Sequence, residues 1–133
     1  YINEDYGSAP TDVNNAISVN KPKTSGIYMS TLYRWKGRIY DSLDDDKNAI
    51  TWYHKAMTAA IKDNPADWRD ICFDYANVLH GAGLLDEADM VYNMMLKVDE
   101  TDTGAMVGYA RNRIDKGDYD EAAAILQLLP AML

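Results

Sequence analysis

The sequence is poor in several features that would indicate particular classes of protein. Its one cysteine, Cys72, cannot form an internal disulfide. No apolar run approaches the ~18 residues that a membrane-spanning helix requires. From Ile27 onward the chain lacks the alternation of apolar and polar residues that is typical of strands. These absences exclude a scaffold of internal disulfides and a membrane span, and they favour helices over a sheet.

Basic residues are also scarce. Thirteen Lys and Arg stand against 21 Asp and Glu, which gives a net charge of −8. The charge is uneven, because residues 1–62 have a balance of +1 and residues 63–133 have a balance of −9. An acidic body of this kind repels phosphate backbones and anionic lipid surfaces. We therefore expect neither a nucleic acid nor a membrane as partner.

Motifs that carry chemistry are missing as well. The sequence has no HExxH, no phosphate-binding glycine loop, no GxSxG and no zinc-type spacing of Cys and His. His54 and His80 are isolated, and Cys72 falls at an inward position that predicts a buried, inert thiol. Asp44–Asp46 is interpreted as a turn that caps the following helix. We predict no catalytic, cofactor or metal site, and hence a protein that is not an enzyme.

What the sequence does contain is a run of helical segments. Hydrophobic residues make up 47% and charged residues 26%, a balance typical of a folded domain. Residues 1–26, with Pro10 and Pro22, are interpreted as a linker or a partly ordered N-terminal segment with one helical turn, and residues 27–133 as the domain. Regular Gly- and Asp-rich breaks divide that domain into helices predicted at 27–43, 47–62, 66–80, 85–97, 103–115 and 119–129.

The helical segments repeat. Gly83–Ala88 matches Gly117–Ala122 at an offset of 34 residues, and the pair Tyr75-Ala76 matches Tyr109-Ala110 at the same offset. An earlier copy carries Gly37 where the later copies have alanine. Because a glycine inside a helix costs about 1 kcal/mol relative to alanine, Gly37 indicates a close approach of two helices. We expect one small residue per helix at each such approach: Gly37, Ala49, Ala76, Ala88, Ala110 and Ala122.

This pattern resembles the tetratricopeptide-repeat family, whose repeat also spans 34 residues. The resemblance covers about residues 30–133 in three copies, and it implies an all-α, right-handed superhelical array of three antiparallel hairpins. The first copy is the divergent one. Lys36 stands where the family has a large apolar residue, and the first period is 39 residues. Pro65 comes four residues late, so we expect a longer second helix in that copy.

The resemblance also implies a groove, lined by the first helix of each hairpin, that holds a peptide. The residues that would line it are Arg34, Arg38, Phe73, Asn77 and Arg111, with Val107 beside them. Family members that clamp a terminal carboxylate use Lys, Asn and Arg here. The match is partial, because Asp70 and Asp74 intrude and Gly104 and Gly108 replace basic side chains. The alternative is that these arginines only pair with Asp41, Asp74 and Asp115.

The function that follows is a non-catalytic scaffold that binds a protein or peptide, with an acidic or carboxylate-bearing segment as the expected ligand. The alternative is a structural spacer or a self-associating array whose copies meet through the apolar residues 119–133. Because the chain begins with Tyr1 and ends in an apolar helix, we expect it to be a module of a larger protein. The sequence indicates no cellular compartment.

Overall fold

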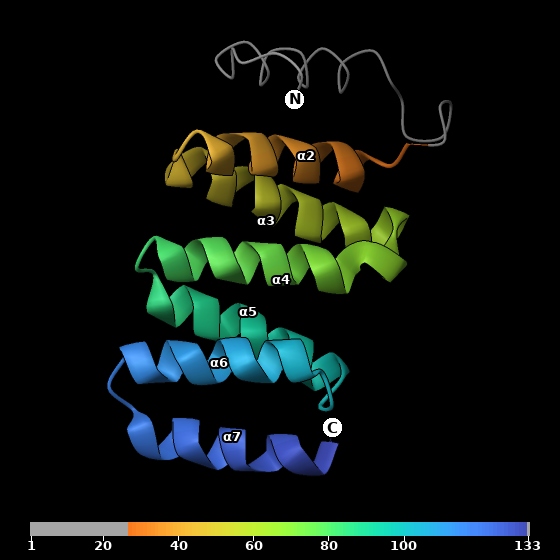
Figure 1. Ribbon diagram of the computed structural model, residues 1–133. Helices are drawn as coiled ribbons and strands as arrows, with labels where there is room; N and C mark the ends of the chain where they lie inside the picture. Colours follow the sequence, from red (N-terminus) through yellow and green to blue (C-terminus); the bar gives the residue numbers. More distant parts are fainter. Residues whose placement is uncertain (1–26, 133) are drawn as a thin grey trace. The chain divides into compact units, whose positions relative to one another are not determined.

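The fold is all-α in the part of the chain that the structure describes. This computed structural model describes residues 27–132, which form six helices and no strand (Figure 1). They are α2 Met29–Ser42, α3 Asp46–Asp63, α4 Pro65–Gly81, α5 Leu85–Val98, α6 Thr103–Asp115 and α7 Tyr119–Met132. Each lies within three residues of its predicted bounds, which confirms the helical prediction. The predicted linker 1–26 lies outside the described residues.

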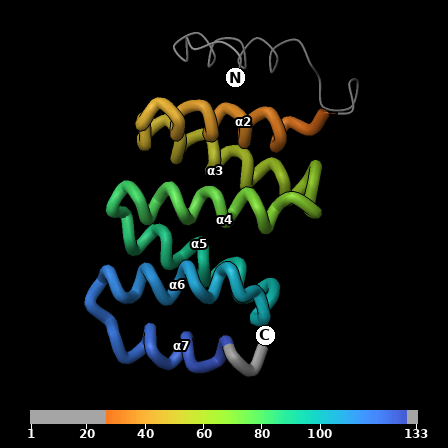
Figure 2. The backbone as a smooth tube through the Cα atoms, viewed as in Figure 1, coloured from red at the N-terminus to blue at the C-terminus, as the bar shows by residue number. Residues whose placement is uncertain are grey.

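The chain divides into two compact units, residues 1–71 and 72–133. In the first unit, α2 and α3 form an antiparallel hairpin (Figure 2). The close approach predicted at Gly37 is present, since a Cβ there would lie 3.0 Å from the ring of Tyr53 on α3. Ala49 and Ala56 of α3 are fully buried. The expected longer second helix is confirmed, because α3 has 18 residues and α5 has 14.

Lys36 shows how the first copy departs from the family pattern. This lysine is 3% exposed, and its Nζ lies 3.5 Å from the centroid of the Trp52 ring. The aliphatic stem thus occupies the place of an apolar side chain, while the ammonium group rests on an aromatic face. Burial, followed by repulsion from Lys55, lowers the pKa of Lys36.

The three turns that follow the first helices share one geometry. Leu84 N–H donates to the Leu79 carbonyl across the end of α4, and Asp118 N–H donates to the Arg113 carbonyl across the end of α6, both at 2.9 Å. These are six-to-one bonds, which place the preceding Gly83 and Gly117 at positive φ. At the end of α2, the same position is held by Asp44, with φ of 58°.

Two helices begin with aspartate caps, and the first of them lies in the Asp44–Asp46 turn that was expected to cap a helix. Asp45 Oδ1 accepts from Asn48 N–H at 3.2 Å before α3, and Asp102 Oδ1 accepts from Ala105 N–H at 3.1 Å before α6. Each cap satisfies a backbone N–H that the helix leaves without an internal partner.

The second unit contains the rest of α4 and the helices α5, α6 and α7. Its small residues Ala76, Ala88, Ala110 and Ala122 are each 2% exposed or less, as predicted. The largest fully buried side chain is Tyr92 of α5. Cys72 is buried, as expected for an inert thiol.

A polar network also ties α6 to its neighbours in this unit. Arg113 Nη2 lies 3.2 Å from Asp89 of α5, and Arg113 Nη1 lies 3.3 Å from Asp118 in the turn before α7. Asn112 donates to Asp89 at 2.6 Å, and Lys116 Nζ lies 2.9 Å from the same carboxylate. Three donors therefore contact the buried carboxylate of Asp89, and these contacts compensate for the cost of its desolvation.

Candidate functional site

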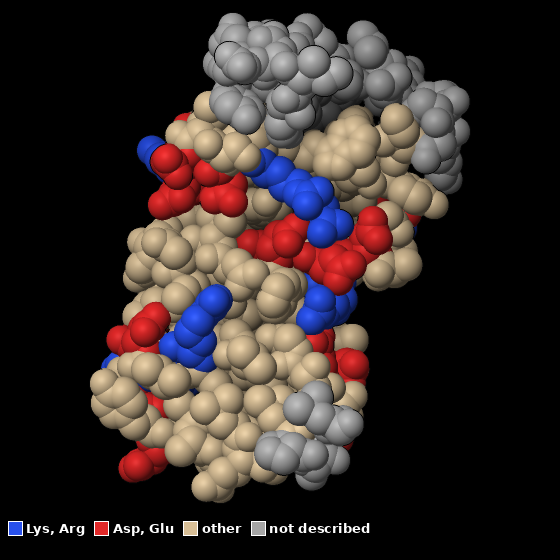
Figure 3. All heavy atoms as spheres, in the orientation of Figure 1, with Lys and Arg blue, Asp and Glu red and all other residues tan. Residues whose placement is uncertain are grey.

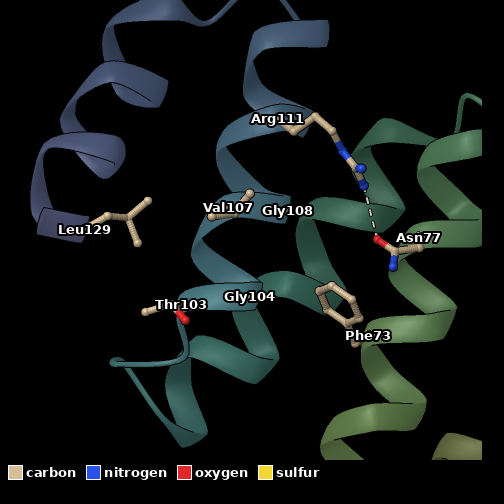
Figure 4. A pocket seen from close by; sticks show the side chains of 8 residues that line it. All are labelled: Phe73, Asn77, Thr103, Gly104, Val107, Gly108, Arg111 and Leu129. Atoms are coloured by element: carbon tan, nitrogen blue, oxygen red, sulfur yellow. Dashed lines mark hydrogen bonds between the residues drawn. The ribbon is translucent and has the colours of Figure 1, made fainter. Parts of the chain in front are cut away.

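One candidate site lies in the second unit, in a groove of about 390 Å³. Three of the five residues predicted for peptide binding line it: Phe73 and Asn77 on α4, and Arg111 on α6 (Figure 4). The remaining lining residues are Thr103, Gly104, Val107, Gly108 and Leu129. Phe73 and Asn77 are four residues apart and so share one face of α4, and Val107 and Arg111 share one face of α6 in the same way.

The width of the groove depends on Gly108. A Cβ at this position would lie 2.4 Å from Cε1 of Tyr92, which is closer than any side-chain contact tolerates. Tyr92 belongs to α5 and is fully buried, so its ring has no room to retreat. Gly108 thereby lets the tyrosine pass against α6 and bring its hydroxyl to the groove.

The Tyr92 hydroxyl joins the two polar residues of the groove. It donates to Asn77 Oδ1 at 2.8 Å, and Arg111 Nη2 donates to the same oxygen at 3.1 Å. Arg111 Nη2 also lies 3.4 Å from the Tyr92 oxygen. One amide oxygen thus accepts from two side chains on two other helices, which fixes the orientation of the Asn77 amide.

The protonation state of the network follows from its surroundings. Burial raises the pKa of the Tyr92 hydroxyl, although the neighbouring Arg111 acts in the opposite direction. The hydroxyl therefore stays protonated at neutral pH and remains a donor. Since the Asn77 oxygen is occupied, its Nδ2 group is left as a donor toward a ligand, together with the remaining N–H groups of Arg111. Such a pair suits a carboxylate or a peptide carbonyl.

The other side of the groove is apolar. Val107 is 49% exposed beside Arg111, and Leu129 of α7 faces it across the opening (Figure 4). The surface over α6 and α7 is mostly uncharged in Figure 3, in contrast to the acidic composition of this half of the sequence. The groove therefore combines two directed polar groups with an apolar wall, which is the composition of a ligand site.

The other two predicted residues, Arg34 and Arg38, lie on α2 in the first unit. Arg38 is exposed and Arg34 is half-buried. The alternative that Arg111 pairs with Asp115 is wrong, because Asp115 lies 2.5 Å from Nε2 of His80 and Arg111 bonds to Asn77 instead.

The sequence reasoning did not assign Gly108, Tyr92, Thr103 or Leu129 to the site. The sequence analysis considered Gly108 only as the replacement of a basic side chain, and it did not predict a role for Tyr92 in this groove. A signal for the tyrosine was present, because a buried tyrosine hydroxyl needs a hydrogen-bond partner and so indicates a polar neighbour. No comparable signal identifies the partner of Gly108.

Other kinds of site can be checked against the described residues. Between residues 27 and 132, no group of three His, Cys, Asp or Glu side chains is arranged to hold a metal ion. None of the helices in this range has the length and apolar character needed to cross a membrane.

Comparison with known proteins gives one family match and two structures of similar fold. A model of the tetratricopeptide repeat matches residues 31–60, which is the copy that we expected to be divergent. A comparison with curated protein sequences gives no match.

Two crystal structures of MamA are similar to the chain in fold. One has a TM-score of 0.75 at 16% identity, covering 96% of this chain and 63% of that chain. The other has a TM-score of 0.76 at 16% identity, covering 96% of this chain and 68% of that chain. The chain thus spans less than two thirds of the first MamA chain. The repeat match, the helical hairpins and this shared fold together support an assignment of the chain to the tetratricopeptide-repeat family.

Proposed function

We propose that the chain is a non-catalytic scaffold whose α4–α6 groove holds a segment of a partner protein. The α4–α6 groove is the one lined by Phe73, Asn77, Val107, Arg111 and Leu129. Residues 27–133 would act as one three-repeat domain of a larger protein. Tetratricopeptide-repeat proteins are generally protein-interaction scaffolds, which supports the broad function.

The observation that carries the finer proposal is the fixed pair of Asn77 and Arg111. Tyr92 orients the amide, so the donors toward a ligand are ordered before it arrives, and less side-chain entropy is lost on binding. The ligand of choice is a peptide with a carboxylate for Arg111 and an apolar side chain for the wall at Val107. A charge-assisted hydrogen bond of this type contributes about 1.5–3 kcal/mol.

The test is binding of labelled octapeptides measured by fluorescence anisotropy. Each peptide carries one glutamate and one leucine at a different spacing, and a matched set carries glutamine in place of glutamate. We expect one spacing to bind best, its glutamine version to bind at least tenfold more weakly, and Arg111→Gln to abolish that preference. Lys97→Gln, which removes an exposed positive charge from α5, is the control and should bind as the parent does. Equal binding of the glutamate and glutamine sets would refute the groove.

A second candidate function rests on the exposed apolar residues of α7. Tyr119 is 66% exposed and Leu128 is 54% exposed, and apolar surface of this kind favours association. In this alternative, copies of the chain assemble through α7 and the α4–α6 groove is idle. Sedimentation velocity at several concentrations distinguishes the two. Association that Leu128→Asp abolishes favours the array, whereas a monomer at every concentration favours the groove.

A further inference from the structure

A second pocket, of about 460 Å³, lies in the first unit where α2 meets α3. We name it the α2–α3 pocket, and the residues that line it are Tyr33, His54, Lys55, Thr58, Ala59 and Lys62. Its residues on α3 recur at intervals of three, four and seven, so they form one face of that helix. Half of the lining side chains are bases, in a chain whose net charge is −8.

The positive charge of the pocket continues beneath it. Lys55 Nζ lies 4.4 Å from the centroid of the Trp52 ring, and the Nζ of buried Lys36 lies 3.5 Å from the same centroid. The Trp52 ring in turn packs on Tyr33, with 5.6 Å between ring centroids. Two ammonium groups therefore share one indole, and their mutual repulsion contributes to the lowered pKa of Lys36. An anion beside Lys55 would relieve that repulsion.

The two exposed lysines of the pocket are not neutralised from within the described chain. Among residues 27–132, neither Lys55 nor Lys62 forms an ion pair with a carboxylate. This sets them apart from Lys116 of the second unit, whose Nζ lies 2.7 Å from Asp86 and 2.9 Å from Asp89. The pocket is thus a local concentration of positive charge that an acidic partner would complete.

The spacing of the lysines indicates what form that partner takes. Lys55 and Lys62 are two helical turns apart, or roughly 10 Å along the axis of α3. One small anion cannot contact both without bending the two side chains toward each other. A peptide in the extended polyproline II conformation rises by about 3.1 Å per residue and has three residues per turn, so carboxylates three residues apart lie on one face, roughly 9 Å from each other, and would match the two lysines. A residue between them would pack on Tyr33 and Ala59.

We propose that the α2–α3 pocket binds an extended acidic peptide segment through two carboxylates, one on Lys55 and one on Lys62. This second binding site is independent of the α4–α6 groove. Its ligand is an acidic stretch of a protein partner, held mainly by α3, with Tyr33 of α2 beside it. Because its contacts are exposed ion pairs, its affinity should be modest and should fall with added salt.

The experiment is a titration followed by ¹H–¹⁵N correlation spectra of the whole chain. Three acetylated and amidated hexapeptides are the probes: one with two glutamates three residues apart, one with adjacent glutamates, and one with glutamines in both places. We expect the first peptide to shift the amides of residues 54–62 and the Trp52 indole N–H, and to bind at least fivefold more tightly than the second. The glutamine peptide should cause no saturable shift.

Variants identify the contacts. Lys55→Gln with Lys62→Gln should weaken binding of the first peptide at least tenfold, while Lys47→Gln on the same helix should leave it unchanged. The double variant removes exposed positive charges, so it should fold as the parent does, which its own spectrum verifies. Arg111→Gln should not alter binding here, so failure of the α4–α6 groove and failure of this site are distinguishable.

Three results would overturn the proposal. The first is equal affinity for the glutamate and glutamine peptides. The second is a mismatch with the predicted contacts. Either the double variant binds the first peptide as tightly as the parent does, or the peptide shifts amides outside α2 and α3. The third is tighter binding of inorganic phosphate than of the first peptide at matched ionic strength, with shifts of the same amides. That last result would assign the pocket to a single oxyanion instead of a paired-carboxylate segment.

Discussion

Asn77 and Arg111 are hydrogen-bonded at 3.1 Å although 34 residues separate them, and that separation equals the length of the sequence repeat. The two residues therefore occupy equivalent positions in successive copies, on α4 and α6. Tyr92 of the intervening α5 reaches the same oxygen. The polar end of the groove thus results from repetition of one helix face, with a buried tyrosine from the second helix as its support.

Removing the Tyr92 hydroxyl should remove a hydrogen bond from the groove without leaving a cavity in the core. In Tyr92→Phe the ring is kept, while the Asn77 oxygen loses one donor and the amide loses its fixed orientation. We expect the free energy of unfolding to fall by about 1 kcal/mol. Affinity for the preferred octapeptide should also fall several-fold. Urea denaturation and fluorescence anisotropy measure the two effects.

Tyr119→Phe is the control for this change, because Tyr119 is 66% exposed and its hydroxyl has water as an alternative partner. Its stability should match that of the parent. A Tyr92→Phe variant that binds peptide as the parent does would show that the hydroxyl does not position Asn77.

Adding one methyl group at Gly108 should be strongly destabilising. Gly108→Ala places Cβ 2.4 Å from the Tyr92 ring, so α5 and α6 must separate. We expect a loss of about 1–3 kcal/mol, even though alanine favours a helix more than glycine does. The same Gly108→Ala change should cost less stability in a Tyr92→Leu background, where the edge of the ring is absent, than it costs in the parent.

Gly81→Ala is the matched control, because a Cβ at Gly81 meets no atom within 4 Å. Its thermal midpoint should equal or exceed that of the parent. If Gly108→Ala were equally harmless, the close contact between Tyr92 and α6 would be wrong.

The turn after α2 offers a stabilising substitution. Asp44 has φ of 58°, a conformation that side chains disfavour and that Gly83 and Gly117 adopt in the corresponding turns. Asp44→Gly should therefore raise the free energy of unfolding by about 0.5 kcal/mol, after the larger chain entropy of glycine is subtracted. Gly83→Ala should lower it by about 1 kcal/mol. Thermal unfolding of both variants tests the pair, and a destabilised Asp44→Gly would contradict it.

The Lys116 ion pairs predict a particular dependence of stability on pH. A hydrogen bond from Lys116 lowers the pKa of Asp86, and bonds to Asp86 and Asp89 raise the pKa of Lys116. The stability that ionised Asp86 contributes is present above the pKa of this group in the unfolded chain, and it is lost as pH falls through the lowered pKa in the folded protein. The Lys116 contribution is present below its unfolded pKa and is lost as pH rises through the raised value.

The difference in thermal midpoint between the parent and Lys116→Met should therefore be constant from about pH 5 to pH 9 and shrink on both sides. Lys97→Met, at an exposed position on α5, should show a difference near zero throughout. A Lys116→Met difference that grows above pH 10 would contradict the assignment.

The helices and their small contact residues could be predicted because both are local or periodic features. Gly37 and Ala88, for example, stand out by helix propensity and by repetition at fixed offsets. The longer α3 followed from the position of Pro65. The cap at Asp45 was recognisable from the place of Asp44–Asp46 before a helical segment, since the chemistry of a cap depends on a few neighbouring residues.

The candidate site was predictable only in part. Phe73, Asn77 and Arg111 could be placed together because the repeat offset brings equivalent positions side by side. The partners of Arg111 and Asp115 could not, because the choice between a salt bridge and a hydrogen bond depends on where α5 places Tyr92. That placement depends on the absence of a side chain at Gly108. The sequence alone does not show whether a glycine inside a helix makes room for a neighbouring side chain or only lowers the helix propensity.

The bonds around Arg113 and Lys116 have a consequence for local unfolding. α6 cannot open without releasing the buried carboxylate of Asp89 on α5 and the Asp118 bond at the start of α7, so fraying of one helix exposes an uncompensated charge on another. Sub-global opening of this region is therefore all-or-none. In native-state hydrogen exchange, the slowest amides of α5 and α6 should share a single protection factor and a single denaturant slope, as one foldon.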